Sequence, residues 1–287
     1  MKVRVAVIQM AGCWDDPTST RERIADLLGC AADAGAALAV LPELSTVSYD
    51  FCSRADVESA AEPLDGPTVQ QWTAIAAQTG MHLVAGLPER LGTRLYNTAV
   101  LVGPAGLVGA YRKAHLYHHE REVFDPGDAA PGVWQTPLGR IGMLICYDLR
   151  FAEVVRLLML RGAHIVCVPT TWTDRGKSRP WDDRGWCGAD YLAAGHAYGS
   201  RLWIACANRA GQDGGVRALG CSGVFAPSGF AVAGPGPHAE EALLVADCDL
   251  HAAEGSRRTP EMDLVADRRP ELYGELARAT SVVYESR

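Results

Sequence analysis

The alternation of apolar runs along the chain constrains its fold more than any other feature. Short runs rich in β-branched residues alternate with segments whose apolar residues recur at helical spacing, and glycine or proline punctuates the junctions. Residues 3–10 and 37–41 are predicted strands on either side of a helix. Ser19 or Thr20 is the expected cap of this helix, and Gly35 its expected end. Its apolar face is formed by Ile24, Leu27, Leu28 and Ala31. This order predicts a layered α/β protein.

The same alternation continues along the chain. Pro67 and Thr68 open a second predicted helix, and Gly80 ends it. The strands on either side of "GPAG" are joined by a turn, so they pair antiparallel and the sheet is mixed. The other strands are expected at 82–87, 97–103, 108–113, 141–146, 164–169, 202–208, 222–234 (a pair) and 242–249, and two more helices at 150–161 and 188–200.

No linker, low-complexity segment or internal repeat divides the sequence. Residues 1–287 are therefore predicted to form a single domain, and 48% apolar residues are enough for a substantial core. Residues after about 255 are expected to form an irregular tail, with a possible contact to a neighbouring subunit.

Composition excludes several classes of partner. The 27 basic and 34 acidic residues give a net charge of −7, so no basic field attracts nucleic acid or an anionic membrane. The start, "MKVRVAVIQM", is too short and too charged for a secretory signal, and no run approaches the ~20 apolar residues of a spanning helix. Nine cysteines without a Cys-x-x-Cys pair are typical of reduced thiols. We expect a soluble, cytoplasmic protein with a small-molecule partner.

Three residues whose side chains can take part in catalysis follow predicted strands: Glu43, Lys113 and Cys146. Ligand sites in α/β sheets gather beyond the carboxyl ends of strands. At a strand-to-helix corner, Cys146 can expose its sulfur, and the amino end of the next helix favours the thiolate. The backbone N–H of Tyr147 would point toward a developing oxyanion. Asp148 is interpreted as a helix cap.

A thiol nucleophile needs a base, and no histidine directly adjoins Glu43, Lys113 or Cys146 in the sequence. Glu43 could serve as the base, with Lys113 stabilising an oxyanion or holding its neighbours ionised. The alternatives stay open at this point. A lone cysteine that closes a strand is usually a small buried hydrophobe, which is also the interpretation of Cys167 and Cys206. Glu43 could cap a turn, and Lys113 could be solvated.

Motifs at these three positions resemble a known family. "LPEL", "YRKAHLY" and "ICYDLRF" are similar to the three signature segments of the nitrilase superfamily of carbon-nitrogen hydrolases. The segments "LDGPTVQQW", "RLYNTAVLVGPAG", "EREVFDPG", "GSRLWIACANRAG" and "DRRPELYG" extend the resemblance, in order, over nearly the whole chain. The resemblance implies a four-layer α-β-β-α sandwich with two stacked mixed sheets, a homodimer or larger homo-oligomer, and no metal or organic cofactor.

The resemblance also implies a role for each site residue. Glu43 would be the general base, Lys113 the oxyanion-stabilising cation and Cys146 the nucleophile. Glu120, in "HHEREVF", matches a second glutamate that positions Lys113 and the substrate nitrogen. The expected reaction is attack of the thiolate on a carbonyl carbon, release of ammonia or an amine, and hydrolysis of the acyl-enzyme by water that Glu43 activates.

The residues after the cysteine bear on the substrate. True nitrilases usually carry Trp-Glu there, whereas "CYDLRF" resembles the branches that hydrolyse amides and carbamoyl compounds, although Ala152 stands where a proline is usual. Arg150 matches a position that holds a substrate carboxylate in some branches. Alternatively, it pairs with Glu153 or another acid. The expected substrate-binding residues are Tyr147, Arg150, Thr171 and Trp172.

Other functions remain possible alternatives: a nitrilase, acyl transfer to an amine, or a catalytically idle assembly protein. The loop at 172–191, rich in tryptophan and charge, shapes substrate choice or forms a subunit interface. "HLYHHE" brings three histidines close to a glutamate, but no matching ligand group lies elsewhere at metal-site spacing, so no metal site is expected.

Overall fold

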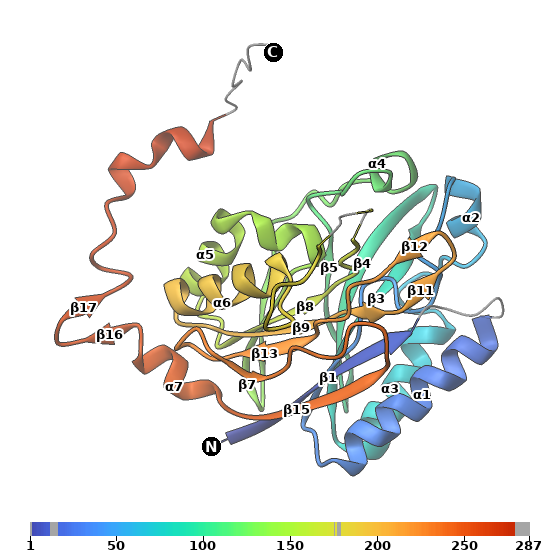
Figure 1. The fold of residues 1–287 in the computed structure, drawn as a ribbon, viewed down its shortest axis with the longest axis horizontal. Helices are drawn as coiled ribbons and strands as arrows, with labels where there is room; N and C mark the ends of the chain where they lie inside the picture. Colours follow the sequence, from blue (N-terminus) through green and yellow to red (C-terminus); the bar gives the residue numbers. More distant parts are fainter. Residues whose placement is uncertain (1, 12–16, 175, 177–178, 279–287) are drawn as a thin grey trace.

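Two mixed β-sheets lie face to face at the centre of the molecule (Figure 1). The computed structural model describes residues 2–11, 17–174, 176 and 179–278. Helices α1 and α3 cover the outer face of one sheet, and helices α5 and α6 cover the outer face of the other (Figure 1). The expected four-layer α-β-β-α sandwich is confirmed. The layers contain helices α1 (Pro17–Asp33), α3 (Pro67–Thr79), α5 (Ala152–Leu160) and α6 (Gly188–Ser200).

The first sheet has the strand order β10-β1-β2-β3-β4-β5, and β15 also pairs with β1. Strands β1, β2 and β3 are parallel, whereas β4, β5 and β15 pair antiparallel with their neighbours. The mixed sheet that the "GPAG" turn predicted is therefore confirmed. The strands are β1 (Lys2–Ala11), β2 (Leu38–Val40), β3 (His82–Leu91), β4 (Arg94–Gly103), β5 (Gly106–Arg112), β10 (Arg209–Ala210) and β15 (Ala242–Asp249).

The second sheet has the order β14-β13-β9-β8-β7-β6, with β7, β8 and β9 parallel. Its strands are β6 (Val133–Thr136), β7 (Gly139–Met143), β8 (Ile165–Pro169), β9 (Trp203–Ala207), β13 (Gly223–Phe225) and β14 (Ala231–Ala233). The short elements outside the two sheets are α2 (Arg54–Glu58), α4 (Glu120–Val123), β11 (Gln212–Asp213) and β12 (Val216–Arg217).

Strand β1 shows why the sequence forms these layers. Its side chains alternate between two apolar environments, as a strand with both faces covered requires. One set packs in the core shared with the second sheet: Val3, Val5 and Val7. The other set packs with residues of α1 and α3: Ala6, Ile8 and Met10.

The helix ends are partly as expected. Helix α3 begins at Pro67 after an N-cap at Gly66 and ends at Gly80, which has a left-handed φ of 72°. Helix α1, however, already includes Ser19 and Thr20, so the prediction that one of them caps it was wrong. The helix begins earlier because Pro17 is well suited to a first helical turn, where its missing N–H needs no partner.

The segment before Cys146 also differs from the expectation. Strand β7 ends at Met143, and a short 3₁₀-helix, η1 (Cys146–Arg150), precedes α5. The chain leaves the extended conformation because Cys146 adopts a left-handed φ of 44°. Cys146 therefore begins a tight turn and does not close a strand.

Beyond β15, the chain leaves the sandwich (Figure 1). It forms α7 (Leu250–Gly255), a hairpin of β16 (Arg258–Thr259) and β17 (Met262–Asp263), and two 3₁₀-turns, η2 (Pro270–Leu272) and η3 (Gly274–Ala277). Leu272 and Leu276 are 64% and 68% exposed. Contact of this arm with a neighbouring subunit stays a prediction. Among the described residues, no helix has both the length and the apolar character needed to cross a bilayer.

Candidate active site

Four residues from both sheets converge at one end of the sandwich. Glu43 follows β2, Lys113 directly follows β5, Glu120 begins α4, and Cys146 begins η1. All four are buried, and Cys146, at 6% exposure, is the most accessible of them. A hydrogen bond from Glu43 N to Thr170 O (3.4 Å) joins the ends of β2 and β8 across the two sheets. The residues predicted to be catalytic are therefore brought together.

Lys113 lies at the centre of this group. Its Nζ is 2.6 Å from Oε1 of Glu43 and 2.8 and 2.7 Å from the two carboxylate oxygens of Glu120. Both glutamates have further donors: Asn97 Nδ2 donates to Glu43 Oε1 (2.8 Å), and the Tyr49 hydroxyl donates to Glu120 Oε1 (2.5 Å). A single cation thus holds two buried carboxylates in a fixed geometry.

Glu43 and Lys113 differ in how readily they gain or lose a proton. Burial raises the pKa of Glu43, Lys113 lowers it, Glu120 raises it again, and the net direction is upward. Burial lowers the pKa of Lys113, but the attraction of Glu120 and Glu43 outweighs burial, so the net direction is also upward. Lys113 therefore remains protonated, whereas burial and Glu120 make Glu43 bind a proton more readily than a carboxyl group in water.

One oxygen of Glu43 is available to bind that proton. Oε1 accepts from Asn97 and Lys113, but Oε2 is buried without a hydrogen-bond partner in the described structure. A buried carboxylate oxygen without a partner is costly and therefore uncommon. Both oxygens of Glu120, in contrast, accept hydrogen bonds. The arrangement leaves Glu43 as the carboxylate that can take up a proton.

The Cys146 thiol is not the pre-ionised group that the sequence suggested. Burial raises its pKa, the nearby Glu43 raises it further, and Lys113 lowers it only in part. The expectation that the thiolate is favoured was wrong, because burial and Glu43 outweigh the attraction of Lys113, and a 3₁₀-turn begins at Cys146 in place of the expected α-helix. The thiol consequently needs a base, and Glu43, with its unpartnered oxygen, belongs to the same cluster of buried residues.

The turn at Cys146 is held by Asp148. Its Oδ2 accepts from the backbone N–H of Ile145 (3.1 Å), the N-cap residue of η1. Asp148 itself lies inside η1, so the prediction that it caps the helix was wrong in position. The same carboxylate accepts from the Tyr111 hydroxyl (3.0 Å) and from both the backbone and the ring of His115 (3.1 and 2.7 Å). Asp148 therefore also ties the turn to the segment that carries Lys113, a connection that the sequence did not reveal.

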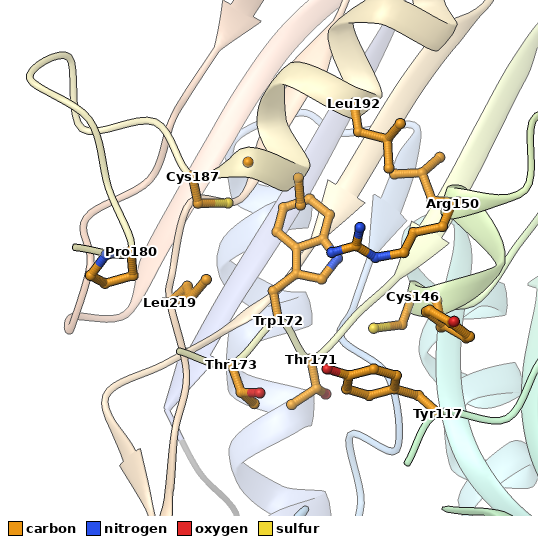
Figure 2. Close-up of a pocket in the computed structure, with 14 residues that line it drawn as sticks. Tyr117, Cys146, Arg150, Thr171, Trp172, Thr173, Pro180, Cys187, Leu192 and Leu219 are labelled. Carbon is orange, nitrogen blue, oxygen red and sulfur yellow. The ribbon is translucent and has the colours of Figure 1, made fainter. Parts of the chain in front are cut away.

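A cavity of about 120 Å³ opens next to Cys146. Figure 2 shows the Cys146 sulfur and the Arg150 side chain extending into the same hollow, which Trp172 borders. All four predicted substrate-binding residues line it: Tyr147, Arg150, Thr171 and Trp172. Tyr117, Cys187 and Leu219 are among the other residues of the wall, and sequence reasoning missed them because they come from separate parts of the chain.

The Arg150 side chain has no ion pair or hydrogen bond within the described part of the chain, and the alternative pairing with Glu153 is not observed. The residues of "HLYHHE" do not gather around one point. His115 contacts Asp148, His118 and His119 contact each other through their Nδ1 atoms (3.1 Å), and Glu120 is bonded to Lys113.

Comparisons with known proteins agree with this geometry. The sequence model of the carbon-nitrogen hydrolases matches residues 4–258. A nitrilase from Pyrococcus abyssi is 32% identical over 272 residues, which cover 94% of this chain and 99% of the relative. An (R)-stereoselective amidase from Pseudomonas sp. is 33% identical over 279 residues, 95% of this chain and 94% of the relative.

Solved structures of an amidase from Nesterenkonia sp. AN1 are similar throughout. The complex of a double mutant with acrylamide superposes with a TM-score of 0.76 at 28% identity, covering 96% of this chain and 97% of that chain. In another mutant of that amidase, acrylamide is added covalently at the active-site cysteine. Because the family match spans most of the sequence and relatives above 30% identity align along nearly their whole length, this chain belongs to the carbon-nitrogen hydrolase family.

Proposed function

We propose that this chain hydrolyses a non-peptide C–N bond in a small linear amide or N-carbamoyl compound through a Cys146 acyl-enzyme. One observation carries the proposal: the buried Lys113 holds Glu43 so that only Oε2 lacks a partner, and Cys146 lies in the same group at a cavity. A thiol, a carboxylate able to exchange its proton and a permanent cation are the parts that acyl transfer through cysteine requires.

The first half-reaction forms the acyl-enzyme. Glu43 Oε2 takes the thiol proton while the Cys146 sulfur attacks the carbonyl carbon, and the carbonyl π electrons move to oxygen. The charge of Lys113 and the backbone N–H of Tyr147 stabilise this oxyanion. As the tetrahedral intermediate collapses, the C–N bond breaks and Glu43 returns the proton to the leaving nitrogen. Ammonia or an amine departs, and a thioester remains on Cys146.

The second half-reaction regenerates the thiol. Glu43 removes a proton from water, the hydroxide attacks the thioester carbon, and collapse expels the Cys146 thiolate, which Glu43 reprotonates. Glu120 acts as a positioning residue throughout. It accepts two hydrogen bonds from Lys113, and it is itself held by the Tyr49 hydroxyl and the backbone N–H of Tyr117. Its oxygens are engaged and are not needed for proton transfer.

Amide and carbamoyl substrates are favoured over nitriles. The Pseudomonas relative is named an amidase and the Nesterenkonia amidase was solved with acrylamide, although the Pyrococcus relative is named a nitrilase. Tyr147 and Asp148 follow the cysteine, where true nitrilases carry tryptophan and glutamate. The unpaired Arg150 at the cavity supports a substrate that carries a carboxylate.

A screen for ammonia release tests the proposal. The panel contains ω-amides, N-carbamoyl amino acids, simple aliphatic amides and nitriles, each assayed with the wild type and with Cys146→Ala. We expect release from an amide or carbamoyl compound, and a loss on the order of 10⁴-fold or more in the variant. Retained release in Cys146→Ala would exclude the mechanism, whereas release from nitriles alone would support the nitrilase alternative.

Two further measurements address the remaining alternatives. Mass spectrometry after treatment with iodoacetamide compares Cys146 with the fully buried Cys167 and Cys206. Equal labelling of all three would favour an idle assembly protein, because a nucleophile at a cavity should react first. Product analysis with added amines separates hydrolysis from acyl transfer, since transfer yields a new amide in place of the free acid.

A further inference from the structure

The first turn of α6 brings a second chemically distinct group together. Cys187 is the N-cap of α6, Asp190 lies in its first turn, and Cys221 belongs to the loop between β12 and β13. One ligand atom from each of the three lies within 4.8 Å of the other two. All three residues are buried, at 1%, 0% and 0% exposure. No step of the proposed hydrolysis uses them.

Asp190 has an oxygen that the protein does not satisfy. Its Oδ2 accepts from the backbone N–H of Cys187 (2.8 Å), but Oδ1 is buried without a hydrogen-bond partner. A buried carboxylate oxygen without a hydrogen-bond partner is a candidate ligand for a bound cation.

The backbone presents Cys221 in an unusual way. It has a left-handed φ of 57°, a conformation that residues other than glycine seldom adopt, and Gly220 before it has a φ of 64°. Its sulfur lies 3.5 Å from the carbonyl oxygen of Gly185. The loop thus bends sharply at the point where the Cys221 sulfur meets the start of α6.

We propose that Cys187, Asp190 and Cys221 form a binding site for a thiophilic divalent cation, with Zn²⁺ as the best match to this donor set. Two sulfurs and a carboxylate suit Zn²⁺, whereas Mg²⁺ and Ca²⁺ prefer oxygen ligands. Zn–S bonds of about 2.3 Å place two thiolates about 3.8 Å apart in a tetrahedron. Because the two sulfurs lie within 4.8 Å of each other, they would have to approach by roughly 1 Å at most to bind the same ion.

Electrostatics is compatible with the ion. Two thiolates and a carboxylate carry three negative charges, so the complex with Zn²⁺ retains one. The amino end of α6, a helix of 13 residues, stabilises that residual charge. The three protein ligands leave the fourth position of a tetrahedral ion for water or another small ligand.

The site borders the catalytic cavity without sharing a catalytic residue. Cys187 lines the wall of the cavity together with Leu219, two residues before Cys221 (Figure 2). A bound ion would join the start of α6 to that loop and hold the wall of the cavity on the side away from Cys146. The inference does not depend on the proposed reaction, because the ion can be measured in an inactive variant.

The test is a metal titration of reduced protein carrying Cys146→Ala, which removes the other thiol among the described residues that line the cavity. Co²⁺ serves as the spectroscopic probe, since thiolate coordination gives a charge-transfer band in the near ultraviolet, and native mass spectrometry with Zn²⁺ gives the stoichiometry. We expect one ion per chain, release of protons on binding and a higher melting temperature. Adding Cys221→Ser or Asp190→Asn should weaken binding by about 100-fold or more, whereas the exposed Cys52→Ser should leave it unchanged.

Two results would overturn the inference. One is the absence of a charge-transfer band at one equivalent of Co²⁺; the other is a band that persists in Cys221→Ser. Circular dichroism shows whether each variant is folded. If Cys221→Ser does not fold, the metal titration of Asp190→Asn takes its place. In addition, alkylation of the Cys146→Ala protein is measured in mild denaturant with and without Zn²⁺, because a bound ion must protect Cys187 and Cys221 from the reagent. Formation of a Cys187–Cys221 disulfide without metal binding would also contradict the site.

Discussion

Asp148 and His115 connect the turn at Cys146 to the segment that contains Lys113 at the end of β5. The His115 ring lies 2.7 Å from Oδ1 of Asp148 through Nδ1, and the same ring stacks on Phe151, with centroids 3.7 Å apart. Asp148 holds the start of η1 through Ile145 N, and Phe151 follows its end. Both ends of the turn that presents the thiol are therefore fixed to the segment after Lys113.

Asp148→Asn should lower kcat on the order of 100-fold with little change in KM, because a misplacement of about 1 Å at a reacting atom has an effect of this size. The amide can accept at one atom only, so the Tyr111, His115 and Ile145 donors compete for it. Steady-state kinetics on an amide that the screen identifies gives kcat and KM separately.

The matched control for this variant is Asp263→Asn. Asp263 accepts backbone hydrogen bonds in the hairpin of the C-terminal arm, far from the cavity. It should change neither kinetic constant. A similar loss of melting temperature in both variants with an unchanged kcat in Asp148→Asn would show that Asp148 contributes to folding alone.

The fold could be predicted from local patterns, and the grouping of Glu43, Lys113 and Cys146 (the trio) from motifs that resemble those of a known family. The short runs rich in β-branched residues and the boundary residues of α3 place the strands and helices, and Glu43 and Lys113 follow strands as expected. The partners of the trio were not predictable. Tyr49 and Asn97 reach the site only through the packing of loops and the register of β4, which no local pattern encodes.

The state of the Cys146 thiol could not be predicted for a related reason. A helix amino end can be recognised from sequence, but the desolvation that raises the pKa depends on how completely both sheets enclose the sulfur. The same applies to Asp190 and Cys221, which approach each other through a loop contact between residues 31 positions apart.

Replacing Asn97 should shift the pH dependence of the reaction. Asn97 donates to Glu43 and so favours its ionised form, which opposes the effect of burial on the pKa. In Asn97→Leu the pKa of Glu43 rises further, and the acid limb of kcat/KM should move to higher pH by about one unit or more. The limb moves to higher pH because Glu43 must be ionised to act as the base.

The pH dependence of stability gives an independent check of the direction in which the pKa of Glu43 shifts. A carboxyl group whose pKa is raised on folding stabilises the fold when protonated, and that contribution is lost as the pH rises through the raised pKa. Asn97→Leu should therefore lose stability mainly at higher pH. Thr98→Val is the control, since its hydroxyl donates to Glu89 on the same strand pair and not to Glu43. A profile of Asn97→Leu that coincides with the wild type would contradict the role of Glu43 as base.

Glu120→Gln should shift the same limb in the opposite direction. The charge of Glu120 raises the pKa of Glu43, and removing it leaves Lys113 to pair with Glu43 alone. The acid limb of kcat/KM should then move to lower pH, even though kcat falls because Lys113 is held less firmly. A pH titration of kcat/KM with both variants measures the two shifts. If Asn97→Leu and Glu120→Gln shift the acid limb in the same direction, the limb reports the ionisation of a group other than Glu43.

Arg150 provides the last prediction, on substrate choice. Its guanidinium reaches the cavity and has no acidic partner in the described structure, so a substrate carboxylate could pair with it bidentately. Arg150→Gln should lower kcat/KM for carboxylate-bearing amides or N-carbamoyl amino acids by about 100-fold, the scale of a charge-assisted pair, and change the rate with a neutral aliphatic amide by less than about threefold.

Comparing the two substrate classes separates recognition from structure. Arg150→Lys keeps the charge but loses the planar fork, so it should recover only part of the activity on acids. Arg156→Gln, on α5 and bonded to the carbonyl of Gly199, should leave the ratio of the two rates unchanged. If Arg150→Gln slows both classes equally, Arg150 supports the turn after Cys146, and the substrate is selected instead by the part of the cavity wall around Trp172.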